Sequence, residues 1–283
     1  MHIDSRYVWQ EPDYGEAALP DSVDFILDVN GDRMLGVLYL PSGIYDEPHP
    51  GVVLCHGIPG TNSNDDLAQG LRRMGCVVIR LYHRGAWGSG GTYSFSHCIE
   101  DAVAAIHWLE TQGAKTYGVD PNALFLIGHS AGGSTVYNAS QQLPELKGTI
   151  LFCPLDHIAL HRYLPEAELR QVFLGFSRVL HITSFEELWQ DSLQHMEQWS
   201  YIRGASYFQH RNLLLIGGSL DTVTPEEVIL KPFWKEILSR PTKADHTYIT
   251  LHSNHSLDTA RLALAQSIGD WIEKVVPSIE TRN

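Results

Sequence analysis

From Gly51 onward, short apolar runs alternate with amphipathic segments, and this alternation limits the possible folds more than any other feature of the sequence. Strands that are separated by helices form a parallel sheet, because each helical crossover returns the chain to the same end of the sheet. The pattern therefore predicts an α/β fold with a mostly parallel, doubly wound sheet and helices on both faces. The expected strands are Gly51–Cys55, Cys76–Leu81, Ala123–Ile127, Thr149–Cys153, Leu213–Ile216 and Tyr248–Leu251.

The segments between these strands carry helical signals. The segment 65–74 has acidic residues in its first turn, arginines in its last turn and a glycine directly after it, as helices commonly do. Further helices are expected from about Ser130, over 225–238, where a proline stands in the first turn, and over 257–275. In the helix that follows the second strand, apolar residues share one face at helical spacing: Ile99, Val103, Ile106 and Leu109.

An antiparallel hairpin is expected before the alternating region. Two strand-like runs, Val23–Val29 and Met34–Leu40, are joined by Asn30-Gly31-Asp32. Asn-Gly between apolar runs is a strong hairpin signal, because both residues tolerate positive φ. The sheet should therefore begin with two antiparallel strands.

One segment interrupts the alternation. Residues 155–204 contain no clear strand and are rich in helix-forming and aromatic residues. In a sheet of this kind such an insertion lies above the strand ends as a cap. We therefore expect a core formed by residues 1–154 and 205–283, with a helical cap insertion at 155–204. Most of the aromatic side chains of the cap are expected only to pack it onto the core.

The charge distribution disfavours nucleic-acid partners. The formal net charge is −13, and lysine and arginine are scattered rather than arranged in a stripe that could follow a phosphate backbone. No stretch approaches the roughly 18 apolar residues of a membrane span, and the first residues lack the basic and apolar regions of a secretory signal. We expect a cytoplasmic protein without a membrane partner, as a monomer or a homodimer.

Metal ions, cofactors and disulfides are not expected. The chain has neither a glycine-rich dinucleotide motif after its first strand nor an HExxH motif. The cysteines form no CxxC pair, and most of them lie in strand-like runs, so buried reduced thiols are expected. These cysteines are Cys55, Cys76, Cys98 and Cys153.

The strongest chemical motif is G-x-S-x-G around Ser130. An apolar strand ends at Gly128 and a helical stretch follows Ser130, so the serine is expected on a sharp strand-to-helix turn that exposes its hydroxyl group. The glycines on either side give this turn the room that it needs. Taken alone, the pattern would also fit a glycine-lined turn in which a serine caps the helix.

A glycine-bearing turn after the first parallel strand can supply hydrogen-bond donors to a reacting carbonyl oxygen. The residues Cys55–Gly60 read CHGIPG. We expect the N–H groups of Ile58 and Ala131 to form an oxyanion hole, in which each donor is worth roughly 3–4 kcal/mol in the transition state. A plain strand-to-helix loop is the alternative for this turn.

An acid and a base follow later strands in the order that a catalytic triad requires. Asp221 comes directly after the strand at 213–216, and His255 follows the last strand. Both should lie at the same end of the sheet as Ser130, because all three residues follow the carboxyl ends of strands. Asp156 is an alternative acid. His252 and His246 are alternative bases, and His129 is expected only to pack beside the nucleophile.

Three stretches together resemble the α/β-hydrolase superfamily: CHGIPG at 55–60, RLYHRGAWGSGG at 80–91 and GHSAGG at 128–133. Within that superfamily the chain is similar to cinnamoyl and feruloyl-type esterases and to prolyl oligopeptidase-like hydrolases. Those families carry D-x-R-G-x-G-x-S after the second core strand; residues 82–89 match it, but His83 departs from the commoner aspartate or phenylalanine. Prolyl aminopeptidases have a similar H-G-x-P-G, but their nucleophile region differs.

The resemblance implies a carboxylesterase-like activity on a small-molecule ester, with Ser130, Asp221 and His255 as the triad. It does not fix the substrate. A peptidase or amidase would use the same triad, and a non-catalytic binding protein would usually have lost part of it. An aminopeptidase would need acidic residues to hold the substrate amine, but the acidic residues of the cap are better explained as a helix surface: Glu166, Glu168, Glu186 and Glu187.

Overall fold

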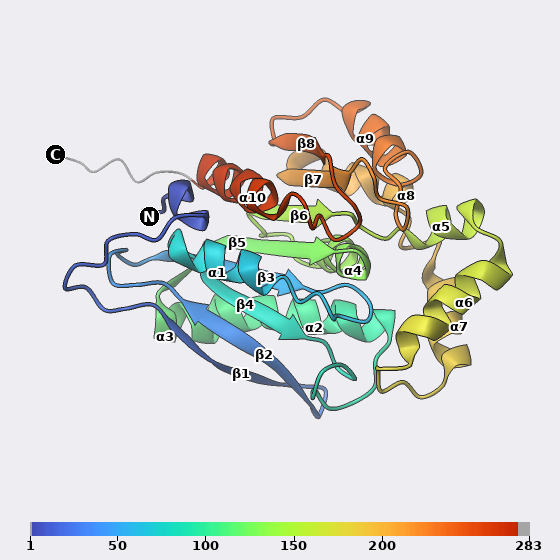
Figure 1. Ribbon diagram of the computed structural model, residues 1–283, viewed down its shortest axis with the longest axis horizontal. Coiled ribbons are helices and arrows are strands. Elements are labelled where there is room, and N and C mark those ends of the chain that lie inside the picture. The colour runs from blue at the N-terminus through green and yellow to red at the C-terminus, as the bar shows by residue number, and fades with distance from the viewer. Residues whose placement is uncertain (1, 277–283) are drawn as a thin grey trace.

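One mixed sheet organises the chain. The computed structural model describes residues 2–276, and its eight strands are ordered β1-β2-β4-β3-β5-β6-β7-β8 (Figure 1). Strands β3 to β8 run parallel, whereas β1 pairs with β2 and β2 with β4 in the antiparallel sense, so the expected fold is confirmed. The strands are β1 Asp21–Val29, β2 Asp32–Leu40, β3 His49–Cys55, β4 Val77–Tyr82, β5 Val119–His129, β6 Gly148–Phe152, β7 Leu213–Gly218 and β8 His246–Leu251.

Helices cover both faces of this sheet. Helices α1 and α10 lie on one face, and α2 and α4 lie on the other (Figure 1). The helices of the core are α1 Asp65–Arg73, α2 Phe95–Trp108, α3 Ala114–Tyr117, α4 Ala131–Ser140, α9 Leu230–Leu238 and α10 Arg261–Val275. Short 3₁₀ helices span Ser5–Val8 and Ala205–His210, and a π-helical turn spans Leu109–Gly113.

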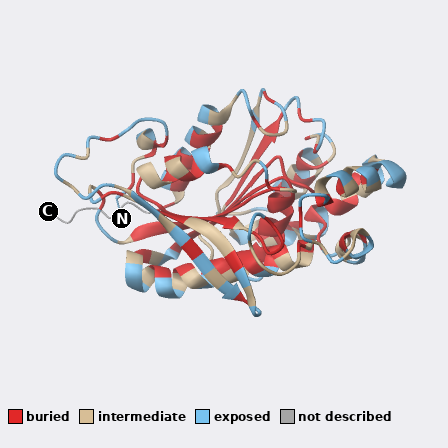
Figure 2. Ribbon diagram, turned by 60° about the horizontal axis from the view of Figure 1, so that its bottom comes forward, coloured by how far each residue is buried: buried red, intermediate tan, exposed pale blue. Residues whose placement is uncertain are grey.

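The two faces carry separate hydrophobic cores, because alternate residues of a strand point to opposite faces of a sheet. In β3, Val52 and Leu54 join the core beneath α1 and α10, whereas Val53 and Cys55 join the core beneath α2 and α4. None of these four side chains is exposed to solvent. The central strands are almost wholly buried, whereas the β1–β2 hairpin is only partly covered (Figure 2).

The hairpin turn has the geometry that its sequence predicts. Asn30 and Gly31 both have positive φ, 54° and 88°, and Val29 pairs with Asp32 across the turn. This two-residue turn twists in the same sense as the strands that it joins. The prediction of an antiparallel start to the sheet is therefore confirmed.

A helical insertion separates β6 from β7. Its helices lie beyond the carboxyl ends of the parallel strands, at the opposite end of the molecule from the two chain termini (Figure 1). They are α5 His157–Tyr163, α6 Glu166–Ser177, α7 Phe185–His195 and α8 Tyr201–Gly204. The segment in which no strand was expected is thus helical.

Helix α9 begins later than the sequence predicts. A helix was expected over 225–238, but the chain forms a turn from Glu226 to Ile229, and the helix begins at Leu230. Pro232 explains the delay, because a proline has no N–H group to donate and is tolerated only in the first turn of a helix. The prediction that Pro225 opens the helix was wrong.

Helix α10 also begins later, at Arg261 instead of residue 257. Leu257 has a φ of 55°, which lies in the left-handed region, and its side chain is fully buried. A leucine with this φ cannot continue a right-handed helix. Burial of its side chain therefore overrides the helical pattern of the sequence at this point.

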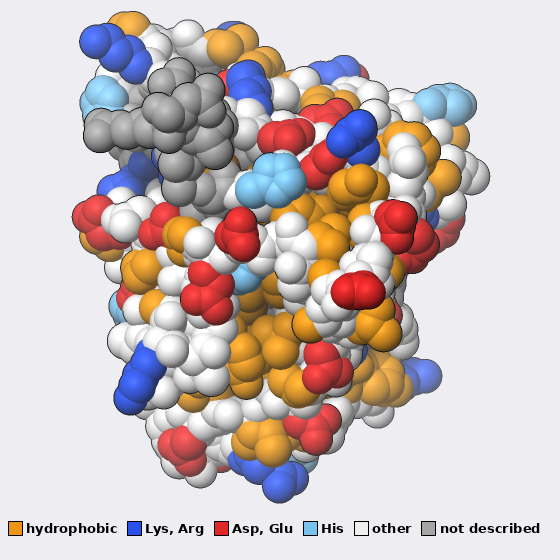
Figure 3. All heavy atoms as spheres, turned by 90° about the vertical axis from the view of Figure 1, so that its left-hand side faces the viewer, with side chains coloured by type: hydrophobic (Ala, Val, Ile, Leu, Met, Phe, Trp, Pro, Cys, Tyr) orange, Lys and Arg blue, Asp and Glu red, His pale blue; other side chains and the backbone are white. Residues whose placement is uncertain are grey.

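The end of the molecule at which the parallel strands begin is shown in Figure 3. Acidic and basic side chains are interspersed there around a band of hydrophobic ones. Among the described helices, none is both long enough and apolar enough to cross a bilayer.

Three of the buried histidines have a pKa well below the usual value. His56 directly follows β3, His129 is the last residue of β5, and His157 is the first residue of α5. Each of these residues is at most 4% exposed. Burial lowers the pKa of each ring to about 3, because the charged form cannot be hydrated there. All three rings are therefore neutral in the folded protein at neutral pH.

The stability of the fold should consequently decrease on mild acidification. In the unfolded chain these rings bind a proton near pH 6.5, but in the folded protein only near pH 3, so the unfolded state binds more protons between these values. The free energy of unfolding should be highest above this window and should fall within it by up to about 1.4 kcal/mol per pH unit for each ring. Urea unfolding at a series of pH values measures this slope.

A pair of variants assigns the slope to buried rings. His157→Gln should reduce the slope by about the contribution of one proton, whereas Gln171→Asn, an exposed substitution that changes no titratable group, should leave it unchanged. The same urea midpoint at neutral and at mildly acidic pH would contradict the prediction.

Candidate active site

Ser130 lies on a strained turn between β5 and α4. Its φ of 55° and ψ of −122° fall in a region that non-glycine residues rarely adopt. Hydrogen bonds fix this geometry: the N–H of Ser130 donates to the carbonyl of Phe152 (3.3 Å), and its carbonyl accepts from the N–H of Leu155 (2.8 Å). The strand-to-helix turn expected for the nucleophile is therefore present, and it holds the hydroxyl group at the sheet edge.

The turn after β3 lies directly against the turn that carries Ser130. A Cβ atom on Gly132 would overlap the backbone carbonyls of Cys55 and His56, and one on Gly57 would lie 2.9 Å from the Cβ atom of Ser130. Glycine is required at both positions because the two backbones approach each other too closely for a side chain. This close approach explains the glycines of both motifs.

The structure brings the three residues of the expected triad together. His255 Nε2 lies 3.0 Å from Ser130 Oγ, and His255 Nδ1 lies 2.9 Å from Asp221 Oδ2. Ser130 follows β5, Asp221 follows β7, and His255 follows β8. The three side chains thus meet because parallel strands end at the same edge of the sheet.

The surroundings of Asp221 favour the charged form of its carboxyl group. Its Oδ1 accepts the N–H groups of Val223 (2.8 Å) and Thr224 (2.9 Å), and its side chain is almost fully buried. Burial acts to raise the pKa of this carboxyl group, but the hydrogen bonds from His255 and Thr224 outweigh that effect and lower the pKa to about 2. The carboxylate can therefore hold the proton on His255 Nδ1 and leave Nε2 facing Ser130.

Sequence reasoning missed Thr224. Its Oγ1 lies 2.8 Å from Asp221 Oδ2, 3.2 Å from His255 Nδ1 and 3.0 Å from the carbonyl oxygen of Cys153. A hydroxyl group has one hydrogen to donate, so Thr224 can donate to the Asp221 carboxylate or to the Cys153 carbonyl, and it can accept a hydrogen bond from His255 Nδ1. A threonine three residues after a loop aspartate is an ordinary turn residue, so the sequence offered no signal for this contact.

Two backbone N–H groups beside Ser130 are available for a ligand. Within residues 2–276, neither the N–H of Ile58 nor that of Ala131 donates to a protein acceptor. Ala131 is the first residue of α4, where the unpaired N–H groups and the helix dipole favour negative charge. These are the two donors that the sequence predicts for an oxyanion hole.

The 82–89 stretch supports the turn after β3. The indole N–H of Trp87 donates to the carbonyl of Pro59 (2.7 Å). His56 Nε2 accepts the N–H of His83 (3.4 Å), so its Nδ1 carries the hydrogen and donates to the carbonyl of Gly57 (2.7 Å). No role for Trp87 was expected from the sequence. In the structure its side chain holds the turn that carries Ile58 through the hydrogen bond to Pro59.

The alternative acid lies elsewhere. Asp156 Oδ1 accepts the N–H of Ala159 (3.1 Å), and Oδ2 accepts the N–H of Tyr201 (3.0 Å). Its carboxylate therefore caps the first turn of α5 and ties it to the first turn of α8. Burial raises the pKa of this group.

The alternative bases also have other partners. His252 Nδ1 lies 3.0 Å from the hydroxyl group of Ser219, in an exposed position. His246 Nε2 lies 2.8 Å from the carbonyl oxygen of Phe208, at the start of β8. Only His255, of the three candidates, is within hydrogen-bond distance of both Ser130 and Asp221.

His129 makes a hydrogen bond in addition to its packing contacts. Its ring stacks on Phe152, with 4.8 Å between the ring centroids, as expected of a packing residue. Its Nε2 also lies 2.9 Å from the carbonyl oxygen of His255. Because that carbonyl accepts, Nε2 carries the hydrogen, and His129 helps to hold the loop that positions His255.

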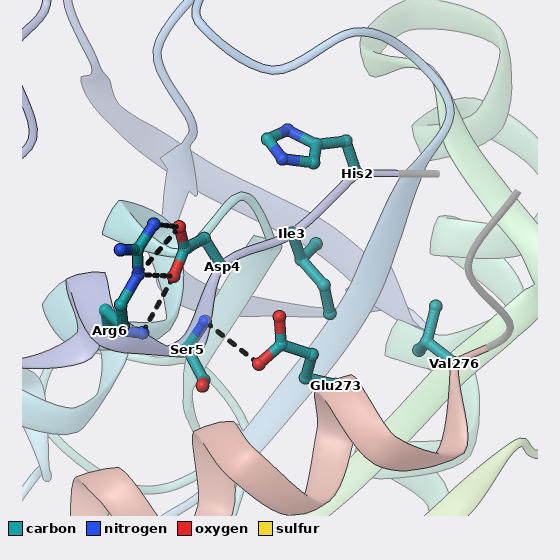
Figure 4. Close-up of a pocket in the computed structure, with 7 residues that line it drawn as sticks. All are labelled: His2, Ile3, Asp4, Ser5, Arg6, Glu273 and Val276. Carbon is teal, nitrogen blue, oxygen red and sulfur yellow. Dashed lines mark hydrogen bonds and ion pairs between the residues drawn. The ribbon is translucent and has the colours of Figure 1, made fainter. Parts of the chain in front are cut away.

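Two hollows open onto Ser130. One, of about 300 Å³, lies under α5 and α6, and the other, of about 160 Å³, lies beside the turn after β3. A third hollow, of about 430 Å³, lies between the N-terminal segment and the end of α10 (Figure 4). None of the predicted site residues lines the third hollow, and its wall includes Asp4, Arg6 and Glu273.

One group of described side chains could offer metal ligands, and it includes Asp221 and His255. Cys153, Asp221 and His255 have their donor atoms within 4.8 Å of one another. A metal ion there would take His255 away from Ser130. The arrangement therefore fits proton transfer better than metal binding.

Comparison with known proteins agrees with this geometry. A family model described as the alpha/beta hydrolase fold matches residues 54–230, which is more than half of the chain. The chain belongs to the α/β hydrolase fold family. The match includes the turn after β3, the turn that carries Ser130 and the loop with Asp221.

Curated relatives of this α/β hydrolase are longer proteins. Carboxylesterase 1E of Mus musculus is 32% identical over 110 residues, which cover 35% of this chain and 19% of the relative. Arylacetamide deacetylase-like 4 of Homo sapiens is 27% identical over 158 residues, which cover 52% of this chain and 37% of the relative. The chain thus spans well under half the length of either relative.

Solved structures share the fold over most of the chain. Est1E from Butyrivibrio proteoclasticus, solved with ferulic acid bound, aligns with a TM-score of 0.66 and 16% identity and covers 88% of this chain and 98% of its own. A serine hydrolase without a lid from Xanthomonas campestris aligns with a TM-score of 0.61 and 17% identity and covers 91% of this chain and 96% of its own.

Gly132→Ala should destabilise this α/β hydrolase by about 2 kcal/mol, because the new methyl group would overlap backbone carbonyls that cannot rotate away. The matched control is Gly175→Ala in α6, where a Cβ atom meets nothing within 4 Å. There alanine should stabilise the protein by up to about 1 kcal/mol. Urea unfolding compares the two, and equal effects would show that the close approach does not constrain the fold.

Proposed function

We propose that this chain is a serine hydrolase that cleaves carboxylic esters through an acyl-enzyme on Ser130. The observation that carries the proposal is the continuous hydrogen-bonded chain from Ser130 Oγ through His255 to Asp221, with distances of 3.0 Å and 2.9 Å. A serine hydroxyl needs an adjacent base, and that base needs a group that orients it. Both partners are within reach here.

In the first half of the reaction, His255 Nε2 takes the proton of Ser130 as Oγ attacks the ester carbonyl. Negative charge develops on the carbonyl oxygen, and the N–H groups of Ile58 and Ala131 are the donors that we assign to it. Asp221 stabilises the imidazolium form of His255. His255 then returns the proton to the leaving alcohol.

In the second half, water replaces the alcohol. His255 removes a proton from the water molecule, which attacks the acyl-enzyme, and the same N–H groups stabilise the second tetrahedral intermediate. As that intermediate collapses, the bond between the acyl carbon and Ser130 Oγ breaks, and His255 returns the proton to Oγ, which releases the acid and restores the serine hydroxyl group. The proposed steps use no cofactor.

The relatives favour esters among the possible substrates. Two of them carry the names carboxylesterase and arylacetamide deacetylase-like, and Est1E holds ferulic acid in its solved structure. An aminopeptidase would need acidic groups that hold the substrate amine near Ser130. Of the four cap glutamates named above, Glu186 is paired with Arg170 at 2.8 Å, and only Glu168 lines a hollow at Ser130. We therefore propose a small-molecule ester as the substrate.

We also propose that the insertion between β6 and β7 acts as a cap over Ser130. Support comes from the walls of the larger hollow at Ser130, which include residues of α5 and α6. A cap of this kind excludes water from the reacting groups and thereby strengthens their electrostatic interactions.

A fluorophosphonate probe should label the protein at Ser130. Such probes react with a serine only when a neighbouring base activates it. Ser130→Ala should abolish labelling, whereas Ser134→Ala, one turn along α4, should keep it. Gel fluorescence and mass spectrometry of the labelled peptide check the result, and persistent labelling of Ser130→Ala would refute the assignment.

Two histidine variants test the base. His255→Ala should lower kcat for a short p-nitrophenyl ester by roughly a thousandfold or more, as removal of a triad member does. His252→Ala should keep most of the activity, because its ring contacts Ser219 and not Ser130. Steady-state rates measure both, and the reverse order would move the base to His252.

A further inference from the structure

The two hollows at Ser130 differ in size and chemistry. We call the larger one, of about 300 Å³ under α5 and α6, the cap hollow, and the smaller one, of about 160 Å³, the loop hollow. Both are lined by Ser130, Ile58, Phe176 and Val223, so they meet at the nucleophile. A substrate bound at Ser130 can place one of its two parts in each hollow.

The cap hollow is apolar. Glu168 is the one charged residue in its wall, and this residue is exposed. No lysine or arginine lines the hollow, so a carboxylate or phosphate inside it would lack a partner. Most of its wall is aliphatic or aromatic, and the side chains of this kind from α5, α6 and the connection between them are Leu160, Leu164, Leu169, Val172, Phe173 and Phe176.

The loop hollow is smaller and more polar. It lies against the backbone of the turn at 57–60, and Thr61, Asn62 and Ser256 add polar side chains to its wall. His255 lines this hollow and does not line the cap hollow. The position of His255 distinguishes the two sides of the site chemically.

The base must pass its proton to the oxygen atom of the leaving alcohol, so that oxygen has to lie on the side of His255. The alcohol part of an ester therefore belongs in the loop hollow. The acyl part points away from His255 and enters the cap hollow. This assignment rests on the proposed ester hydrolysis, and it adds which hollow binds the acyl part and which binds the alcohol part.

We propose that the substrates are esters of an uncharged, apolar acid of about six to ten carbon atoms with a short or polar alcohol, and that Phe176 separates the two binding regions. A methylene group fills about as much space as a water molecule, roughly 30 Å³. A hollow of about 300 Å³ therefore holds about ten such groups at most. Phe176 is placed to divide the regions because it lines both of them.

The first test is a series of ethyl esters from acetate to dodecanoate, hydrolysed by the unmodified protein in a pH-stat. The value of kcat/KM should rise by up to about fourfold for each added methylene group, which is the gain from removing that group from water. It should level off or fall beyond about ten carbon atoms. A maximum at acetate would overturn the proposal.

A charged substrate tests the apolar wall directly. Monoethyl adipate has the same chain as ethyl hexanoate but ends in a carboxylate. Its kcat/KM should be at least tenfold lower, because the carboxylate would be buried without a cation. Equal values for the two esters would show that the acyl chain does not enter the cap hollow.

A variant of α6 tests whether the acyl chain binds in the cap hollow. Val172→Trp should fill the cap hollow and move the optimum to shorter acyl chains, with acetate hydrolysis retained. Gln171→Trp, on the exposed side of the same helix, is the matched control and should keep the profile of the unmodified protein. If Val172→Trp does not fold, Leu164→Phe narrows the same hollow. An unchanged optimum in a folded cap-hollow variant would overturn the proposal.

The alcohol side is tested with hexanoate esters of ethanol, butanol and benzyl alcohol. Phe176→Ala should open the loop hollow toward the cap hollow and raise the benzyl-to-ethyl ratio of kcat/KM by about tenfold. An unchanged ratio would refute the role of Phe176. If none of the esters is hydrolysed and the fluorophosphonate probe does not label the protein, the proposed function itself is refuted. If the esters are hydrolysed but kcat/KM does not depend on acyl length, only this inference is refuted.

Discussion

Direct backbone contact between the turn after β3 and the turn after β5 is the constraint on which the rest of the site depends. The two strands are neighbours, and Cys55, the last residue of β3, pairs with Gly128, one residue before β5 ends. Sheet register therefore sets the position of Ile58 relative to Ser130 before any side chain contributes. Glycines at 57 and 132 allow the contact, because no side chain would fit between the backbones. Fixed donors of this kind need no reorganisation when charge develops, which is why they are effective in catalysis.

A second constraint acts on the acid–base pair. Asp221 receives hydrogen bonds from Thr224 and His255, and His129 holds the carbonyl of His255 from the other side. These groups lie in a largely buried region, where hydrogen bonds are stronger than in water and an unpaired polar group is costly. The imidazole ring of His255 is therefore held both through its side chain and through its backbone, and its orientation toward Ser130 does not depend on one contact alone.

Much of this arrangement could be predicted from the sequence because the strongest signals are local. Apolar runs defined the strands, and the rule that parallel strands end at one edge brought Ser130, Asp221 and His255 to that edge. The contacts of Trp87 and Thr224 could not be predicted, because they depend on how loops distant in sequence fold against each other. The predicted starts of α9 and α10 were wrong for a related reason, because Pro232 and the burial of Leu257 override the local helical pattern. The hollow under α6 is formed by the packing of whole helices, which periodicity does not determine.

The position of Asp156 has a consequence for how this fold can change. One carboxylate binds the first turn of α5, where the chain leaves the sheet, and the first turn of α8, where the chain returns. The insertion thus begins and ends at almost the same point. Residues can be added or removed between these two turns without moving β6 or β7, since the entropy of closing a loop grows only slowly with its length. The region that shapes the cap hollow can therefore diversify while the register that fixes Ser130 relative to the turn after β3 stays intact.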